Sequence, residues 1–504
     1  MAITASVQRP DAEWRIISSA WALAGIVVVA AALRLLFLGQ RSYWLDEVIS
    51  VELARLSGSE LLHAWTSTEP NMPFYTLLLR AWIRAFGEGE LAVRLLSCLP
   101  SIAVVPALYA LVLRLFDRNT ALLSSALLAL HAFQIHYGQE ARSYSLVCFL
   151  ALLSSWALVE AVRQPGAGRW CVYVLVSVSA IYSHACAAFI LLGHAASIYL
   201  CPFGRGSRRG FLVSVAVTVL LALPLLWLVA ARVAGLDTTG LALSGIRGLW
   251  RSFLGIGGTS PLFALLSIVA VVIAMLPLRR LPAPMLVASS HSEYGIPESW
   301  ARWFTFFWLI APIVVLSLVS VRKSFLIDRY LIVAAPAVVI LVARAVLRAP
   351  SRRHLQWAVA ILLVLSTERV IHHFRRASGA DWRRATALLI EKTGESDAIV
   401  LSPYYTRINI DHYQRRQGAR RELPIVWPTQ WRALYDPPEA DPSRQDLAAL
   451  AARHERLWLV LSHTKETVAT RFGASIDGIY SLVEMTSLTG IAIAQYQHNA
   501  DAPD

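Results

Sequence analysis

The sequence predicts a mostly α-helical membrane protein of many spans that ends in a small α/β domain. Two features of composition support this prediction: 56% of the 504 residues are hydrophobic and only 16% are charged, which is typical of integral membrane proteins. A third observation is that repeated apolar runs fill most of residues 1–371. Each run is at or near the length that crosses a bilayer. The net charge of +13 also belongs to this part, because residues 372–504 hold equal numbers of acidic and basic residues.

The apolar runs predict about eleven spans, some of them shorter than the usual ~20 residues. They are residues 19–39, 92–113, 119–134, 143–162, 171–183, 186–201, 211–231, 261–278, 302–320, 330–347 and 355–371. With a cytoplasmic N-terminus, the arginine-rich connections fall inside, as the positive-inside rule requires. Basic residues in short loops between apolar runs favour a bilayer over nucleic acid as the partner. The odd number of spans places the C-terminus outside.

An acidic pair, Asp46 and Glu47, follows the first apolar run directly and faces outward in this orientation. After it, the pattern predicts two amphipathic helices along the membrane surface, near 48–62 and 74–86. The two prolines of the turn between them fix its shape and can present Glu69 toward the acidic pair. We therefore predict a cluster of three carboxylates. The other acids of this loop are interpreted as solvated loop residues; they are Glu52, Glu60, Glu88 and Glu90.

A second polar group lies at the outer end of the third and fourth spans, in the segment 136–144. Glu140 and Arg142 in it either pair with each other or leave the arginine to grip a phosphate with two hydrogen bonds. Further basic and aromatic residues lie at outer span ends, where snorkelling is the simpler interpretation for arginine and a structural role the commoner one for histidine. These residues are Arg94, Arg329, Tyr330 and His184.

The tail changes character and shows α/β patterning. Helices are predicted near 381–392, 407–416 and 444–455, and strands near 397–402, 457–461, 480–484 and 490–496. We predict a membrane domain at residues 1–372 and an extracytoplasmic α/β domain at residues 373–504. No glycine-rich phosphate loop or nucleophile elbow appears in the tail, so a supporting role is expected for it.

Five motifs in order resemble a known family. They are Trp44–Glu47, the Pro-x-x-Pro-Phe-Tyr turn at 70–75, Glu90–Leu95, Tyr137–Tyr144 and Asp328–Leu331. Together they resemble the protein O-mannosyltransferase-like glycosyltransferases of family thirty-nine, which include the lipid A aminoarabinose transferases. Motif order and topology agree over roughly residues 15–372, and the tail is similar to that of bacterial members.

This resemblance implies a GT-C membrane fold and an inverting transfer of a sugar from a polyprenyl-phosphate carrier to an acceptor hydroxyl outside the bacterial inner membrane. Asp46 matches the acidic residue that activates the acceptor, with Glu47 and Glu69 shaping the site. Arg94 matches the arginine that contacts the carrier phosphate. Assisting residues at the phosphate are Arg142, Arg329 and Tyr330, and neighbours of the substrate site are Tyr137, Glu140, Tyr144 and His184.

The chemistry agrees with the resemblance, because a hydroxyl needs a general base and a departing phosphate needs fixed positive charge. Many family members have His-Pro-Pro where this chain has Asn71, Met72 and Pro73, which leaves the acceptor open among glycolipids, polysaccharides and proteins. No nucleotide site is required and no cofactor is assigned. A divalent cation at the acidic cluster is left open, since a carboxylate count alone does not assign a metal.

Two other classes of protein would share part of the pattern. A transporter or lipid flippase would also have many spans, but its charges should lie near the midplane on repeated, broken helices, whereas those here lie at outer span ends. A receptor would use the tail but leave Asp46, Glu69, Arg94 and Arg142 without a role. The discriminating feature is whether these four side chains meet in one outward cavity.

Overall fold

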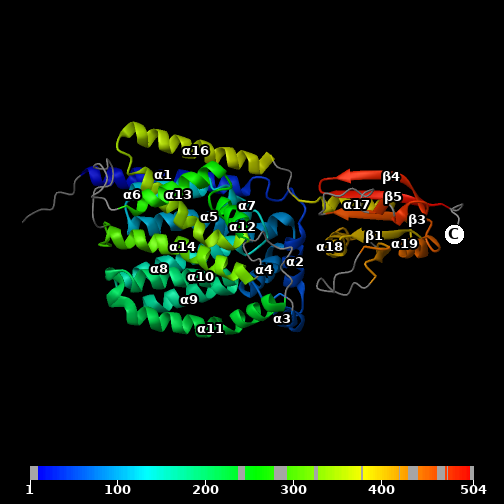
Figure 1. Cartoon of the computed structure of the whole chain (residues 1–504), viewed down its shortest axis with the longest axis horizontal. Coiled ribbons are helices and arrows are strands. Elements are labelled where there is room, and N and C mark those ends of the chain that lie inside the picture. The colour runs from blue at the N-terminus through cyan, green and yellow to red at the C-terminus, as the bar shows by residue number, and fades with distance from the viewer. Residues whose placement is uncertain are drawn as a thin grey trace, which may run out of the picture. The chain divides into compact units, whose positions relative to one another are not determined.

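The computed structural model describes residues 10–67, 69–235, 245–276, 292–322, 327–375, 379–418, 421–429, 441–462, 472–473 and 475–499. These residues form 19 α-helices and one five-stranded sheet (Figure 1). The predicted fold class, mostly helical with a small C-terminal sheet, is confirmed. The chain divides into two compact units. The membrane unit holds Met1–Leu36, Leu62–Leu78 and Arg94–Arg375, and the sheet unit holds Phe37–Leu61, Leu79–Val93 and Arg376–Asp504.

The membrane unit is a helical bundle, in which Figure 1 shows α8, α9 and α11 side by side. Its helices are α1 (Pro10–Leu35), α5 (Glu90–Leu115), α6 (Arg118–Ala129), α7 (Ala132–Gly138), α8 (Tyr144–Arg163), α9 (Ala167–Ser183), α10 (Phe189–Tyr199), α11 (Arg208–Gly235), α12 (Gly245–Ile256), α13 (Pro261–Met275), α14 (Glu298–Arg322), α15 (Ala335–Val346) and α16 (Arg352–Arg375). Short 3-10 helices, η1 (Ala185–Ala188), η2 (Pro202–Ser207) and η4 (Asp328–Ala334), precede α10, α11 and α15.

Six of the described helices are long and apolar enough to cross a membrane, or seven if α12 and α13, which meet at 85°, form one bent span. Three further apolar helices are shorter: Ser19–Leu35, Ala167–Ser183 and Ala185–Tyr199. The chain is thus a multi-pass membrane protein, but the predicted number of eleven spans is not confirmed. Helix α12 was not predicted, and the last two residues of the span predicted at 261–278 lie outside the described residues.

The span predicted at 119–134 is two helices in the structure, because tertiary contacts interrupt it. Helix α6 ends at Ala129, and its last carbonyls accept hydrogen bonds from the buried guanidinium of Arg34 on α1, at 3.0 Å for Ala129 and 3.3 Å for Leu128. His131 then serves as the N-terminal cap residue of α7 and binds the carbonyl of Ile256 at 2.9 Å. Neither partner is close in sequence, so hydropathy alone could not locate this break.

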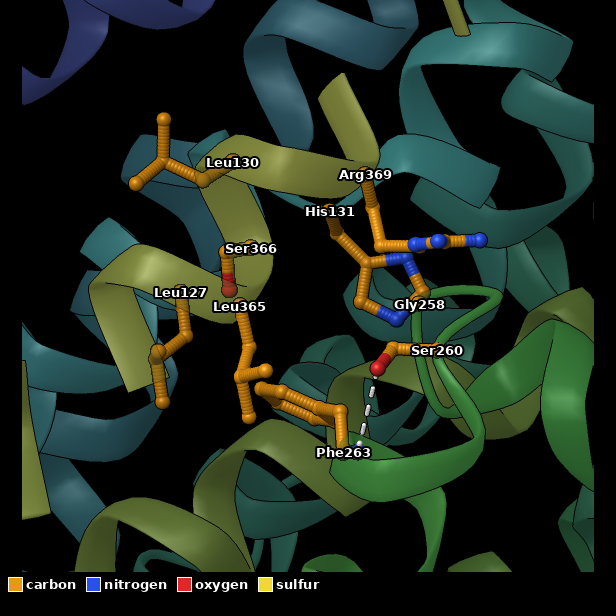
Figure 2. A pocket seen from close by; sticks show the side chains of 9 residues that line it. All are labelled: Leu127, Leu130, His131, Gly258, Ser260, Phe263, Leu365, Ser366 and Arg369. Atoms are coloured by element: carbon orange, nitrogen blue, oxygen red, sulfur yellow. Dashed lines mark hydrogen bonds between the residues drawn. The ribbon is translucent and has the colours of Figure 1, made fainter. Parts of the chain in front are cut away.

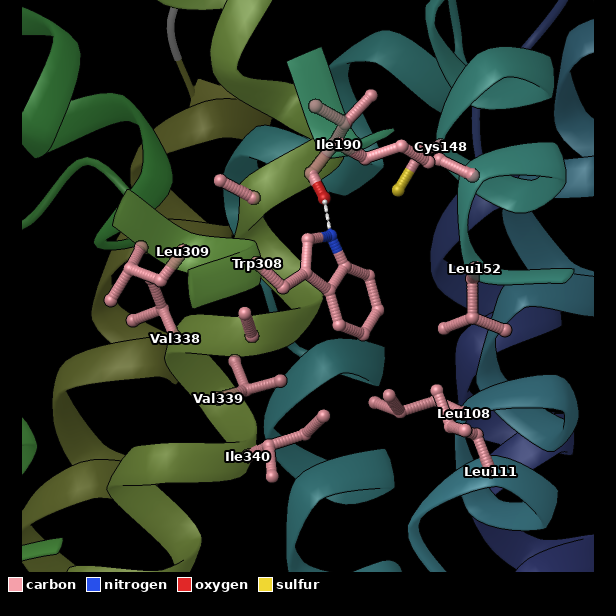
Figure 3. Packing of buried hydrophobic residues seen from close by; sticks show 14 of the residues in the cluster. Leu108, Leu111, Cys148, Leu152, Ile190, Trp308, Leu309, Val338, Val339 and Ile340 are labelled. Carbon is pink, nitrogen blue, oxygen red and sulfur yellow. Dashed lines mark hydrogen bonds between the residues drawn. The ribbon is translucent and has the colours of Figure 1, made fainter. Parts of the chain in front are cut away.

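The core of the bundle is apolar and tightly interleaved. Trp308 of α14 is fully buried among side chains from α5, α8, α10 and α15 (Figure 3). Its indole Nε1 donates a hydrogen bond to the carbonyl of Val333 at 2.9 Å. A buried donor without a partner costs about 1–3 kcal/mol, so this hydrogen bond allows a tryptophan to fill the centre of the bundle.

A buried ion-pair network joins four helices of the membrane unit. Oε1 of Glu298, at the start of α14, lies 2.6 Å from Arg344 Nη2 and 2.8 Å from Arg348 Nη2. Arg344 also reaches Oδ2 of Asp117, the cap residue of α6, at 2.9 Å. Arg348 donates to carbonyls at the C-terminal end of α13, including Ala274 at 2.9 Å. One carboxylate therefore holds two guanidinium groups from the end of α15, and their other contacts reach α6 and α13.

The sheet unit contains α2 (Leu45–Arg55), α17 (Trp382–Lys392), α18 (Arg407–Arg416), α19 (Arg444–Ala451), β1 (Ala398–Ser402), β2 (Ile425–Trp427), β3 (Arg456–Ser462), β4 (Tyr480–Leu488) and β5 (Ile491–His498), with a short 3-10 helix, η5 (Tyr404–Thr406), before α18. Helices α3 (Gly58–Ser67) and α4 (Pro73–Phe86) cross from one unit's range into the other's, and the first residues of α5, up to Val93, also fall in the range of the sheet unit. Each helix and strand predicted in the tail has a counterpart here, whereas the short strand β2 was not predicted. The domain limits at 372 and 373 stay a prediction.

The strand order is β2-β1-β3-β5-β4. Strands β2, β1 and β3 are parallel, and β5 and β4 complete the sheet as an antiparallel pair. All five residues of β1 are buried, as expected for a central parallel strand covered on both faces. Strand β4 is an edge strand and is mostly exposed, which explains why its apolar pattern is weaker.

Helices α2 and α18 pack together in the sheet unit through charged side chains. Glu52 Oε1 lies 2.6 Å from Arg415 Nη2 and 2.7 Å from Nδ1 of the buried His412. Glu90 is also buried and accepts hydrogen bonds from Arg383 at 2.7 Å and Tyr413 at 3.0 Å. The interpretation of these two acids as solvated loop residues is therefore wrong. The sequence did not reveal these four partners, because His412 and Arg415 lie at least 360 residues from Glu52, and Arg383 and Tyr413 at least 293 residues from Glu90.

The contacts of Glu52 make the sheet unit sensitive to acid. Burial alone raises the pKa of Glu52, but the hydrogen bonds and charges of His412 and Arg415 outweigh it and lower this pKa below 4.5. A carboxyl whose pKa is lowered by folding stabilises the folded state above its unfolded pKa, and this contribution is lost as pH falls through the folded pKa. We expect the melting temperature of the purified chain to fall between pH 5 and pH 3, and Glu52→Gln to make this fall smaller. An identical pH profile for both proteins would contradict the expectation.

Candidate functional site

The acidic pair begins helix α2 of the sheet unit. Trp44 is the N-terminal cap residue, and Glu47 Oε2 accepts a hydrogen bond from the Trp44 backbone N–H at 3.2 Å. Glu47 is 1% exposed, whereas Asp46 is partly exposed. Val48 and Val51 bury the apolar face of the helix. Glu47 therefore holds the start of the helix, and Asp46 is the member of the pair that solvent can reach.

Glu69 lies in the turn before α4, in the membrane unit. Its backbone N–H donates to the carbonyl of Ala64 at 2.7 Å, and its carboxylate acts electrostatically on the phenol of Tyr330. Met72 in the same turn is buried and has a φ of 72°, a left-handed conformation that costs a non-glycine residue roughly 1–3 kcal/mol and tends to occur at functional sites. The predicted meeting of Glu69 with Asp46, which belongs to the sheet unit, stays a prediction.

Asn71 ties this turn to the junction of α9 and η1. Its Nδ2 lies 3.0 Å from Nε2 of His184, and its Oδ1 accepts the backbone N–H of Ala185 at 3.1 Å. Burial, followed by the charges of Arg142 and Arg329, lowers the pKa of His184 to about 3. The imidazole is therefore neutral at physiological pH. Asn71 is one of the residues at which the sequence departs from the family pattern, and that departure did not predict this contact.

Two arginines converge on one aromatic ring. The guanidinium carbons of Arg142 and Arg329 lie 5.9 Å and 5.7 Å from the ring centroid of Tyr144. The ring of His184 is 5.6 Å from Tyr144 and 5.0 Å from Tyr330. Five of the predicted residues are thus brought together, although the two arginines are 187 positions apart in sequence. Paired guanidinium groups beside aromatic walls suit a phosphate.

Glu140 balances part of this charge. Its Oε1 lies 3.1 Å from His136 Nε2. Burial alone raises the pKa of Glu140, but the charge and hydrogen bond of His136 and the charges of Arg329 and Arg142 together lower it below its ordinary value. Glu140 is therefore ionised at neutral pH. The structure adds His136 to the two alternatives left open by the sequence, because the closest ion-pair partner of Glu140 is this histidine.

Arg94 and Tyr137 approach the same segment from α5 and α7. Ser97 Oγ, three residues beyond Arg94 on α5, lies 2.9 Å from the carbonyl of Arg142. Residues three apart lie on one face of a helix, so the buried Arg94, near the start of α5, lies on the face of α5 that meets this segment. The ring of Tyr137 is 4.9 Å from that of Tyr144. The membrane unit thus gathers the predicted basic and aromatic residues at one group of helix ends.

A small pocket lies elsewhere in the membrane unit. Its lining is mostly apolar (Figure 2) and consists of Leu127, Leu130, His131, Gly258, Ser260, Phe263, Leu365, Ser366 and Arg369. The Ser260 hydroxyl oxygen accepts the Phe263 N–H at 3.2 Å and caps α13, so this serine has a structural role. None of the predicted site residues lines the pocket. Within the described residues, no group of three or more His, Cys, Asp or Glu side chains is placed to hold a metal ion.

Residues 68–233 match the family model described as dolichyl-phosphate-mannose-protein mannosyltransferase. No match is found among curated proteins. The chain is similar to the crystal structure of ArnT from Cupriavidus metallidurans in the apo state, with a TM-score of 0.60, 14% identity, and coverage of 95% of this chain and 98% of that chain. The undecaprenyl phosphate complex of the same protein matches with a TM-score of 0.58 and 13% identity, over 96% and 99% of the chains.

A second similarity is to the archaeal oligosaccharyltransferase AglB from Archaeoglobus fulgidus in complex with an inhibitory peptide and a dolichol-phosphate. The TM-score is 0.54 at 14% identity, over 97% of this chain and 75% of that chain. At these identities the similarity shows the fold, which is that of GT-C glycosyltransferases. The resemblance indicated by the five sequence motifs is confirmed.

Proposed function

We propose that this protein is an inverting glycosyltransferase. The GT-C fold and the match of residues 68–233 to the mannosyltransferase family model support this proposal. The enzyme moves a sugar from a polyprenyl-phosphate carrier to an acceptor hydroxyl at the outer face of the bacterial inner membrane. The observation that carries the proposal is the convergence of Arg142 and Arg329 on Tyr144 beside a neutral His184. Fixed cations at the ends of apolar helices suit a lipid whose head group is anionic.

The arginine pair binds the phosphate of the carrier. As the bond between the sugar and the phosphate breaks, negative charge grows on the phosphate oxygen, and donors already in place stabilise it without reorganisation. Arg142 is 8% exposed, so its charge acts in surroundings that screen it less than bulk water does. Arg94, buried at the start of α5, adds a third positive charge on this side. Structures similar to this chain contain undecaprenyl phosphate and dolichol-phosphate.

Asp46 acts as the general base. It takes the proton of the acceptor hydroxyl while the oxygen attacks the anomeric carbon from the face opposite the phosphate, so one displacement inverts that carbon. Glu47 holds the helix end that carries Asp46 through its hydrogen bond to Trp44, and Glu69 shapes the acceptor side. The sugar and the acceptor, whether glycolipid, polysaccharide or protein, and any divalent cation at these carboxylates are left open.

The orientation follows from the arginine-rich connections. We place the N-terminus in the cytoplasm, the membrane domain at residues 1–372 and an extracytoplasmic supporting domain at residues 373–504. The sugar then reaches the enzyme already attached to its carrier, so the enzyme needs no nucleotide site.

The test is a transfer assay in detergent with radiolabelled polyprenyl-phosphate sugars and cell-envelope extract. Wild type should move label from the carrier to an extract component. We expect Arg142→Met to lower kcat/KM about 100- to 1,000-fold. Arg169→Met is the matched control, because Arg169 is bonded only to Gln164 among the interactions described for its side chain. If wild type consumes no carrier sugar, or if Arg142→Met transfers at the control rate, the proposed function is wrong.

A further inference from the structure

We propose that Gln139 is a positioning residue for sugar transfer: it binds the ends of α1 and α16 and so fixes the polar segment, residues 136–142, which consists of the end of α7 and the turn after it and carries Glu140 and Arg142. The proposal rests on the proposed function, and it assigns a role to a motif residue that has no part in the chemistry described above. All of the contacts that support it lie within the membrane unit.

Gln139 uses both ends of its amide. Nε2 lies 2.8 Å from the carbonyl of Leu36, 3.2 Å from that of Arg34 and 3.3 Å from that of Leu33. The last carbonyls of a helix have no partner within the helix, so the side chain caps the C-terminal end of α1. Oε1 lies 3.1 Å from Nε2 of His373, near the end of α16. Gln139 is 9% exposed, and water competes little for these hydrogen bonds.

Arg34 holds the end of α1 to two further helices, α5 and α6. Its buried guanidinium donates to Ser101 Oγ at 2.8 Å and to the last carbonyls of α6. A cation at the C-terminal end of a helix is favourable because that end carries partial negative charge. The backbone is closely packed here: a Cβ on Gly138 would lie 2.5 Å from Ser101 Oγ. A larger residue at 138 would push the polar segment away from α5, which carries Ser101.

The position of Gln139 in sequence links these helix-end contacts to the candidate site. Glu140 is the next residue, and the backbone N–H of Arg142 donates to the carbonyl of Glu140 at 2.8 Å. A shift of the Gln139 backbone therefore moves the Arg142 guanidinium. The chain continues from the capped end of α1 toward Asp46, ten residues beyond Leu36, and from α16 into the tail. Gln139 thus connects the segment that carries Arg142 to the ends of α1 and α16.

The competing explanation is that Gln139 only stabilises the fold. Measurement of kcat separates this structural role from a positioning role. A misplacement of about 1 Å costs up to about 100-fold in rate when geometry is the limiting factor. We expect Gln139→Met, which keeps the length of the side chain but not its hydrogen bonds, to lower kcat at least about tenfold with KM for the carrier sugar changed less than threefold. His373→Phe should lower kcat as well. The double variant should be no slower than Gln139→Met, because His373→Phe breaks the hydrogen bond between His373 and Gln139 that Gln139→Met has already removed.

The matched control is Gln164→Met, since Gln164 is also a glutamine that accepts a side-chain hydrogen bond, from Arg169, in a loop at an end of α8. Hydrogen exchange of residues 136–143 supplies a readout that needs no activity: it should be faster in Gln139→Met than in wild type and unchanged in the control. Unchanged exchange together with unchanged kcat would overturn the proposal. A lower melting temperature with normal kcat per folded enzyme would overturn it too. If the wild type is inactive, both the proposed function and the role of Gln139 in transfer are refuted. Hydrogen exchange of residues 136–143 still tests whether Gln139 holds the segment in place.

Discussion

Asp46→Asn is expected to lower the rate of sugar transfer about 100- to 10,000-fold, the range typical of a lost general base. Asparagine keeps the size of the side chain but cannot take the proton of the acceptor hydroxyl. Asp46 begins α2 and is partly exposed, so the substitution should leave the fold intact. The measurement is single-turnover transfer from a radiolabelled polyprenyl-phosphate sugar, with the melting temperature measured on the same preparation.

Glu60→Gln is the matched control for this variant. Glu60 comes from the same loop, is exposed, and accepts a hydrogen bond from the backbone of Ser57 at 2.8 Å. Its substitution should leave transfer within about twofold of wild type, since surface changes away from a site have small effects. Equal rates for Asp46→Asn and Glu60→Gln would remove Asp46 from the mechanism.

Glu298→Gln should destabilise the membrane unit by about 3–5 kcal/mol, because removal of one partner from a buried ion pair leaves uncompensated charge. Glu298 Oε1 is shared by Arg344 and Arg348, which are 1% and 5% exposed. Without this carboxylate, two buried guanidinium groups face each other with Asp117 as the acid that still contacts Arg344. Unfolding in detergent, followed by tryptophan fluorescence, measures the loss.

Glu368→Gln provides the comparison for a surface pair. Glu368 and Arg369 form an ion pair on α16 at 2.6 Å, with the glutamate side chain 50% exposed. Exposed pairs contribute about 0–1 kcal/mol, so this variant should unfold close to wild type. If the two glutamate variants lose the same stability, the network at Glu298 does not hold the four helices together.

The site could be predicted in part from local patterns. Arg142, Glu140, Tyr137 and Tyr144 lie in one short polar segment between apolar runs, and such a segment draws attention because charge at membrane depth is costly unless it is used. Gln139 lies in the same segment but was not singled out, because an amide side chain carries no charge. Its role follows from contacts with Leu36 and His373, near the ends of α1 and α16, which the sequence does not place beside it.

The sequence by itself determined the class of protein, most helices, the strands β1, β3, β4 and β5, and the family resemblance. These features depend on apolar periodicity and short motifs, which are local properties of the chain. Only the tertiary structure decided that the apolar run at 119–134 breaks after Ala129 and that Arg142 and Arg329 share the ring of Tyr144. Both results depend on packing between segments far apart in sequence, and hydropathy carries no information about which side chains such packing brings together.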